Sequence, residues 1–156
     1  MSATGKEAAS PKPFDRAAVI STLARASQRE LSAALDAIGQ PDGWSWLRAP
    51  ETGLVMVRGR IGGGGPPFNL GEASVTRASV QLRGGQTGHA YALSRNRKAA
   101  GDAALLDALW QTEAREEVED SILRPVRSRI ATQDALEEAE AAATTVDFFT
   151  LVRGDD

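Results

Sequence analysis

The alternation of hydrophobic and polar positions is clearest in the middle of the chain. An apolar run at residues 54–57 passes into an alternation at 58–61, which is typical of a strand that moves from the core to a polar edge. Residues 73–82 alternate with period two, and residues 87–93 do so again after a Gly-Gly turn at 83–86. The pattern predicts an antiparallel meander of three strands.

The two faces of the predicted second strand differ in character. One face is expected to point inward and carries Thr76, Ala78, Val80 and Leu82, whereas the other carries Val75, Arg77, Ser79 and Gln81. On the third strand His89 and Tyr91 are two residues apart, so they project together. Residues 62–67 hold four glycines and two prolines, which interrupt strand pairing, and a loop is expected there.

Two helices are predicted before the meander. Asp15 can cap a short first helix, and Ser27 with Glu30 has the spacing of a capping box that opens a second one. Apolar residues then recur at helical spacing, and Gly39 is well placed to end the second helix. These features predict a helical hairpin at the N-terminal side of the sheet.

A further strand is predicted between the helical hairpin and the meander, at residues 44–48. Pro50 and the turn-forming residues 51–53 follow it directly. Because proline and glycine punctuate regular structure, the strand is expected to end there.

Helical patterns return after the meander. Ser94 or Asn96 can cap a helix that runs to about Thr112, and its apolar stripe is expected to cover the sheet. The acidic residues 113–120 are poorly patterned, so they are interpreted as a solvated helical end or connector. Pro125 is expected to interrupt the helix after this segment.

The remaining segments complete an α+β fold. Residues 128–144 favour a helix with little to bury, because large apolar side chains are few there. Residues 146–153 are rich in β-forming residues and predict a final strand. Residues 1–13 are small, charged or proline and are expected to form a disordered tail. The chain is therefore expected to fold as a single domain over residues 14–156, with a helical hairpin before an antiparallel meander in the sequence, and helices and a final strand after it.

Composition narrows the possible partners of this domain. A length of 156 residues with 42% hydrophobic content suits one sizeable core. The net charge of -3 gives no global basic field, so a duplex nucleic acid or an anionic membrane is not expected as the primary partner. No run approaches the roughly 20 apolar residues of a membrane span. The chain lacks cysteine, which excludes disulfides and thiolate chemistry and is compatible with the cytoplasm.

The glycine loop and the arginines around it are the first candidate chemistry. Residues 62–65 could expose backbone amides to an anion, but no Walker or dinucleotide pattern surrounds them, so a flexible connector is the favoured interpretation. Arg58 and Arg60 precede the loop, and Arg77 and Arg95 lie in or beside later strands. These cations form either phosphate or partner contacts or a set of solvated sheet edges, and the sequence leaves both open.

A complete active site is not visible in the sequence. His89 is the only histidine, so a metal site would lack the usual second imidazole, and no nucleophile elbow is present. A packed structural role for His89 is favoured over contact with a ligand. The acidic residues Glu51, Glu72 and Asp147 show no spacing that pairs them for acid-base work. No catalytic residue, metal ligand or bound cofactor is predicted.

Several stretches of the chain closely resemble the G-subunit family of the carbon-phosphorus lyase core complex. The resemblance is carried by LRAPETGLVMVRGRIGGGGPPFNLGEASVTR, GHAYALSRNRKAA, DALWQ and AATTVDFFTLVRGD, and it covers the chain from about Phe14 to the C-terminus. The most specific parts are residues 58–72 and 146–154. Where the family is expected to have Gly-Arg-Asp, this sequence has Ser94-Arg95-Asn96.

The resemblance implies a cytoplasmic accessory subunit that assembles with the H, I and J subunits, most directly with I. In that family the G subunit works with the H, I and L proteins to transfer ribose 5-triphosphate from MgATP to an alkylphosphonate, with loss of adenine. MgATP would be the substrate of the complex. The alternative from the residues alone is a stand-alone anion-binding protein or enzyme, in which Arg58, Arg60, His89, Arg95 and the glycine loop contact a phosphate.

Overall fold

The computed structural model describes residues 14–144, and its architecture is the predicted α+β fold. The elements follow in the order α1 (Arg16–Ala24), α2 (Gln28–Ile38), β1 (Trp44–Arg60), a 3-10 turn (Ile61–Gly63), β2 (Pro67–Leu82), β3 (Thr87–Ala92), α3 (Arg97–Leu109), α4 (Arg115–Val118), a π-helical turn (Glu119–Leu123) and α5 (Arg124–Ala143). The strands form one antiparallel sheet in the order β1-β2-β3. The meander is confirmed, whereas the final strand predicted at 146–153 lies outside the described residues.

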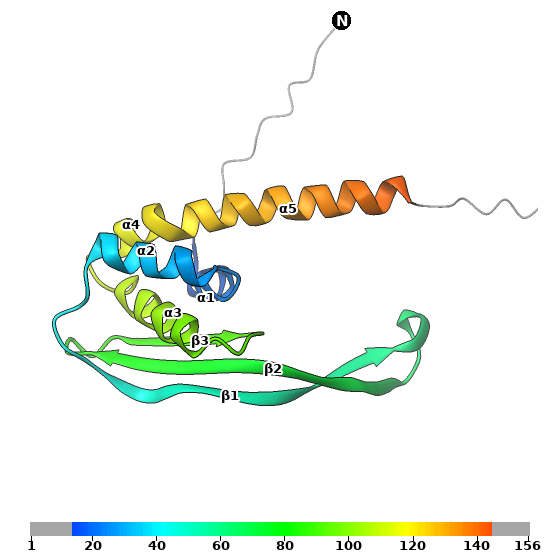
Figure 1. Cartoon of the computed structure of the whole chain (residues 1–156), viewed down its shortest axis with the longest axis horizontal. Coiled ribbons are helices and arrows are strands. Elements are labelled where there is room, and N and C mark those ends of the chain that lie inside the picture. The colour runs from blue at the N-terminus through cyan, green and yellow to red at the C-terminus, as the bar shows by residue number, and fades with distance from the viewer. Residues whose placement is uncertain (1–13, 145–156) are drawn as a thin grey trace, which may run out of the picture.

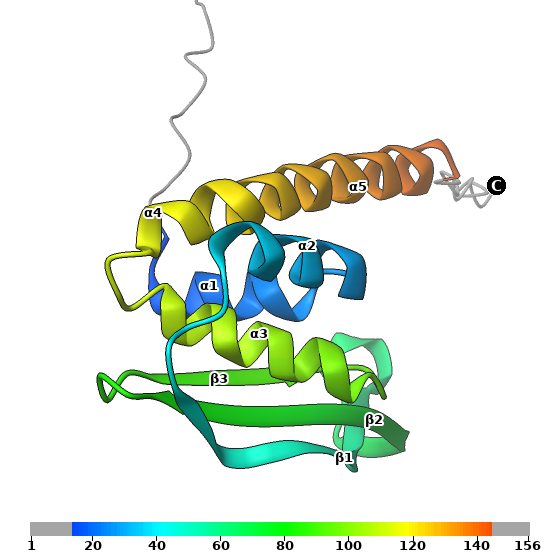
Figure 2. The same cartoon turned by 60° about the vertical axis from the view of Figure 1, so that its left-hand side comes forward.

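The helices of the described chain lie on one face of the sheet (Figure 1). Helix α3 packs directly on β2 and β3, α1 and α2 cover α3, and α5 is outermost, as Figure 2 shows from a second direction. On β2 the predicted inward face is buried, with Thr76, Ala78, Val80 and Leu82 between 0% and 7% exposed. Helix α3 therefore covers the sheet as predicted, and it is itself covered on its other side.

Close contact between β3 and α3 depends on a glycine. A Cβ atom placed on Gly88 would lie 1.9 Å from the carbonyl oxygen of Ala104, which no real side chain tolerates. The absence of a side chain lets the strand approach the helix backbone.

The helix starts agree with the predicted caps. The Asp15 carboxylate accepts the Ala18 amide at 2.7 Å, and Ser27 and Glu30 form the full capping box. Gly39 ends α2 with a φ of 90°. Of the two candidates before α3, Asn96 is the cap, because its side-chain oxygen accepts the Ala99 amide at 3.0 Å.

The prediction that a first strand ends at Pro50 is wrong. Strand β1 continues through Pro50 and the expected turn at 51–53, and Glu51 pairs with Arg77. Register shifts on either side of Arg48 accommodate the irregular residues. Because β1 is an edge strand, a proline at such a shift removes no essential ladder bond.

The start of the second strand also differs from the prediction. Strand β2 begins at Pro67, six residues before the expected start at Ala73, so the glycine loop is shorter than predicted. The hairpin between β2 and β3 is confirmed at residues 83–86. Within this connection only Gly85 has a positive φ, of 91°. The Leu82 amide donates to the Gln86 carbonyl and closes this connection.

The acidic segment is more than a solvated connector. It forms α4 and a π-helical turn that lead without a break into α5. Val118 of this segment and the following Ile122 and Leu123 are at most 1% exposed and belong to the core. Pro125 does not end the helix: it lies in the first turn of α5, directly after the π-helical turn, where the regular i→i−4 ladder is already interrupted. Residues 128–144 are helical and largely exposed, as predicted.

A buried carboxylate joins three elements and closes the outer edge of β3. Asp107 of α3 is fully buried, accepts the His89 amide at 2.8 Å and pairs with Arg16 of α1 at 3.0 Å. Arg16 and Gln111 also donate to the Thr87 carbonyl, at 2.6 and 2.7 Å. Backbone groups on this edge of β3 are therefore occupied by side chains, which discourages further strand pairing there.

Candidate functional site

Strands β1 and β2 continue beyond the end of β3 as a two-stranded arm, here called the hairpin arm and comprising residues 53–75. The last residue of β3, Ala92, pairs with Thr76, so no third strand supports the arm within the described residues. Figure 1 shows the arm projecting past α1 and α3. An isolated two-stranded ribbon is marginally stable in water, so the arm is an element that gains from a covering surface.

Large apolar side chains are exposed along the hairpin arm. They are Leu54 (61% exposed), Met56 (52%), Val57 (39%), Ile61 (74%), Phe68 (41%) and Leu70 (61%). Leu54 and Met56 lie at alternate positions on the face that carries the helices elsewhere in the sheet. Leu70 and Phe68 lie over Gly59 on the opposite face. Large apolar side chains exposed on both faces of one element are typical of an interaction site.

Arg58 and Arg60 are exposed near the tip of the hairpin arm. Strand β1 is continuous from Glu51 to Arg60, so both arginines share the face of Leu54 and Met56. Arg60 donates to the Gly65 carbonyl at 3.1 Å. The tip thus presents cations next to apolar side chains.

The glycine loop closes on itself. The Gly65 amide donates to the Ile61 carbonyl at 3.0 Å, and Gly62 takes a φ of 61° in the 3-10 turn. The Gly65 amide is therefore used inside the turn, which favours the connector interpretation over an anion cradle.

His89 and Arg95 lie elsewhere on the sheet. The His89 ring is on the outer face of β3, where Nδ1 is 2.9 Å from the Ser79 hydroxyl. Arg95 follows β3 and donates from Nε to the Ser74 hydroxyl at 2.9 Å, at the base of the hairpin arm. Both side chains have protein partners.

The predicted phosphate contacts do not converge. His89 pairs with Ser79, whereas Arg58 pairs with Asn69 on the same strand. Ten residues separate these two partners, and at about 3.3 Å per residue they are roughly 33 Å apart along β2. One small anion cannot contact His89 and Arg58 together, so the arrangement offers no single phosphate site built from all four predicted residues.

The outer face of the sheet carries a charged cluster. Glu51 accepts hydrogen bonds from Arg48 and Arg77, each at 2.6 Å. These hydrogen bonds, from Arg48 first and Arg77 second, lower the pKa of the Glu51 carboxyl. Two arginines share one carboxylate, so the cluster keeps a net positive charge. A shallow hollow of about 290 Å³ lies beside it, lined in part by Val75 and Tyr91.

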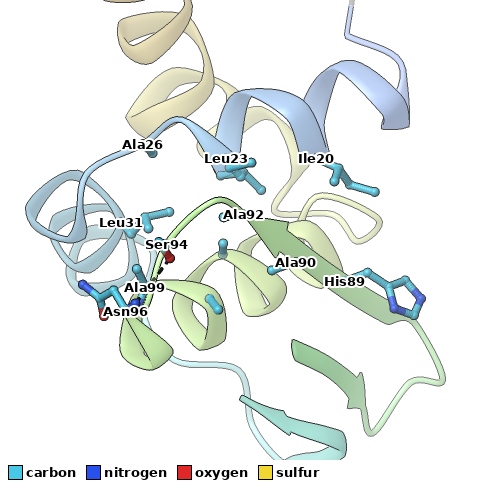
Figure 3. A pocket seen from close by; sticks show the side chains of 13 residues that line it. Ile20, Leu23, Ala26, Leu31, His89, Ala90, Ala92, Ser94, Asn96 and Ala99 are labelled. Carbon is cyan, nitrogen blue, oxygen red and sulfur yellow. Dashed lines mark hydrogen bonds between the residues drawn. The ribbon is translucent and has the colours of Figure 1, made fainter. Parts of the chain in front are cut away.

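The described chain also contains a small apolar cavity between α1, α2, α3 and β3 (Figure 3). Its volume is about 60 Å³, and leucine and alanine side chains such as Leu23, Leu31 and Ala99 line it. The His89 ring lies at its margin and points away from Leu23 and Leu31 (Figure 3). Pockets for cofactors or drug-sized ligands have volumes of roughly 300 to 1,000 Å³, so this cavity cannot hold a nucleotide.

Neither a group of metal ligands nor a membrane-spanning helix is found in the part of the chain that the structure describes. Among residues 14–144 no three histidine, aspartate or glutamate side chains are grouped as a metal site would require. Within the same range no helix has the length and apolarity to cross a membrane.

The apolar surface of the hairpin arm was not predicted from the sequence. Residues 54–57 are apolar at odd and even positions alike, which is typical of a strand covered on both faces. The chain provides helices for one face of the sheet, and α1 and α3 end before the arm (Figure 1). A two-sided apolar strand without enough covering elements is therefore the signal that points to a partner.

Comparisons with known proteins give consistent results. The family model described as phosphonate metabolism protein PhnG matches residues 14–154. The chain is 50% identical over 134 residues to the alpha-D-ribose 1-methylphosphonate 5-triphosphate synthase subunit PhnG of Rhizobium meliloti (strain 1021), and the match covers 86% of each chain.

Proposed function

The chain belongs to the phosphonate metabolism protein PhnG family, and from that membership we propose that it is an accessory subunit of the cytoplasmic carbon-phosphorus lyase core complex. In this role it works with the H, I and L proteins to transfer ribose 5-triphosphate from MgATP to an alkylphosphonate, displacing adenine. Its structural partners are the H, I and J subunits, and the I subunit is the most direct.

The observation that supports this proposal best is the uncovered hairpin arm. Leu54, Met56 and Leu70 are more than half exposed, on a ribbon that no third strand of the described chain supports. Interfaces that hold permanent complexes together expose such apolar surfaces in the free subunit. The candidate polar residues are dispersed over the sheet, so catalysis is assigned to the assembled complex and not to this chain alone.

The proposal predicts that the purified chain neither hydrolyses MgATP nor releases adenine. With the H, I and L proteins and an alkylphosphonate, adenine release should accompany formation of the ribosylated phosphonate, and omission of this chain should abolish transfer. Both products can be followed by chromatography. The same mixture without the phosphonate is the control. Adenine release by this chain alone would contradict the accessory role.

A further inference from the structure

We propose that a partner subunit adds an extended, acidic segment as a fourth strand along the free edge of β1 in the hairpin arm. The inference rests on the proposed function, because it specifies how this subunit binds within the complex. It assigns recognition to backbone amides and carbonyls of β1, supported by the apolar and cationic side chains beside them.

The ladder shows which backbone groups of β1 are free. The His89 amide points away from β2 to Asp107, so Ser79 and His89 form a non-hydrogen-bonded pair. Odd-numbered residues of β2 around Ser79 therefore direct their backbone groups toward β1. Glu51 pairs with Arg77 and Gly53 pairs with Val75, so these two residues of β1 use their backbone amides and carbonyls in hydrogen bonds to β2. The backbone groups of Thr52, Leu54 and Met56 consequently point to the free edge.

The backbone groups on the β3 edge and on the β1 edge of the sheet differ in their hydrogen bonding. Side chains of Arg16, Asp107 and Gln111 occupy the backbone groups of Thr87 and His89 on the β3 edge. No strand of the described chain pairs with the outer edge of β1. The pairing from Glu51 to Val57 is regular, without the bulges that usually protect an edge. A partner protein can add a strand to an open, regular edge of this kind.

Side chains of the hairpin arm define the chemistry of the added strand. On one face Leu54 and Met56 are followed by Arg58 and Arg60, so a paired strand meets apolar side chains first and two cations next. Cross-strand neighbours of opposite charge stabilise a sheet and like charges destabilise it. The fitting segment therefore alternates, with apolar residues opposite Leu54 and Met56 and carboxylates opposite the arginines.

Charge also argues against a second copy of this chain as the occupant. Within the hairpin arm, Arg58 and Arg60 against Glu72 give two positive charges and one negative charge, a net +1. Parallel, in-register pairing of two such arms would bring Arg58 and Arg60 of one copy against the same residues of the other. An acidic segment of another subunit relieves this repulsion, whereas a second copy increases it.

Hydrogen–deuterium exchange of the co-expressed complex and of the free full-length chain tests this inference. In the free chain the amides of Glu51, Gly53 and Val55 should exchange slowly because they bond to β2, while those of Thr52, Leu54 and Met56 should exchange quickly. In the complex the second set should become about tenfold or more slower. A complex that forms without this alternating protection overturns strand addition and leaves the accessory role intact. Failure of any complex to form overturns both.

A matched pair of variants separates backbone pairing from side-chain contact. Leu54→Pro removes a backbone amide that points to the free edge, and it breaks no hydrogen bond to β2. The residue before it is Gly53, whose backbone tolerates a following proline. Leu54→Ala removes the side chain and keeps the amide. If β1 is augmented, Leu54→Pro should bind the I subunit about tenfold more weakly than Leu54→Ala, with similar melting temperatures. Equal binding by the two variants contradicts the inference. Protection of the same amides in the free chain that rises with its concentration would assign the edge to a second copy instead.

Discussion

At the scale of single residues, Asp107 is a fully buried carboxylate that joins α1, β3 and α3. It holds the His89 amide and the Arg16 guanidinium at hydrogen-bonding distance. Hydrophobic patterning could not identify it, because an aspartate on a helix is ordinarily solvated. Its partners come from α1 and β3, which are distant in sequence.

Replacement of Asp107 by alanine should lower the free energy of unfolding by about 2 to 4 kcal/mol, because the His89 amide loses its acceptor and the part-buried Arg16 loses its ion-pair partner. Chemical denaturation of the full chain measures the change. Asp134→Ala is the matched control, since Asp134 forms only an exposed ion pair with Arg25 and its loss should have little effect. Equal stabilities for the two variants would show that the buried network is dispensable.

At the scale of elements, the features that could be predicted from sequence are local. Caps such as Asp15 and the Ser27–Glu30 box depend on neighbours a few residues away, so their spacing is sufficient evidence. The passage of β1 through Pro50 could not be predicted in the same way. It depends on β1 being an edge strand with register shifts around Arg48, and that is a property of the assembled sheet.

The contact between α2 and α5 predicts a pH dependence. Burial alone would raise the pKa of Glu30, but hydrogen bonds from Arg129 and Ser27 outweigh it and lower that pKa. A carboxyl with a lowered pKa in the folded state stabilises the protein above its unfolded pKa and loses that contribution as the pH falls through the folded value. The Glu30 contribution should therefore be present at neutral pH and disappear in acid, below about pH 4.

This pH dependence can be isolated with Glu30→Gln. The variant should be less stable than the natural chain at pH 7, and the difference should shrink as both are acidified. Thermal unfolding across the range from neutral pH to about pH 3 provides the comparison. A difference that stays constant with pH would mean that the Glu30 charge does not contribute through Arg129.

At the scale of the whole molecule, the fold class was accessible from the sequence and the functional surface was not. Amphipathic patterns report which residues avoid water, and they predicted the buried face of β2 correctly. The same patterns cannot distinguish burial inside a chain from burial against another subunit. Leu54 and Met56 are apolar yet exposed here, so the sequence predicted a core position where the structure presents a surface.

The role of Arg58 and Arg60 can be tested only in the assembled complex. If these arginines contact an acidic partner, Arg58→Ala and Arg60→Ala combined should reduce ribosyl transfer by more than about threefold at subsaturating subunit concentration, beyond the ~0.5 kcal/mol of an ordinary surface change. The melting temperature of the free chain should not change, because both side chains are exposed. The deficit relative to the natural chain should shrink as salt is raised, since screening weakens the charge contacts that the two arginines make in the natural chain. Arg83→Ala is the control, because it removes a positive charge from the hairpin at the opposite end of β2. Equal transfer by the double variant and the control would assign Arg58 and Arg60 to solvated edge positions.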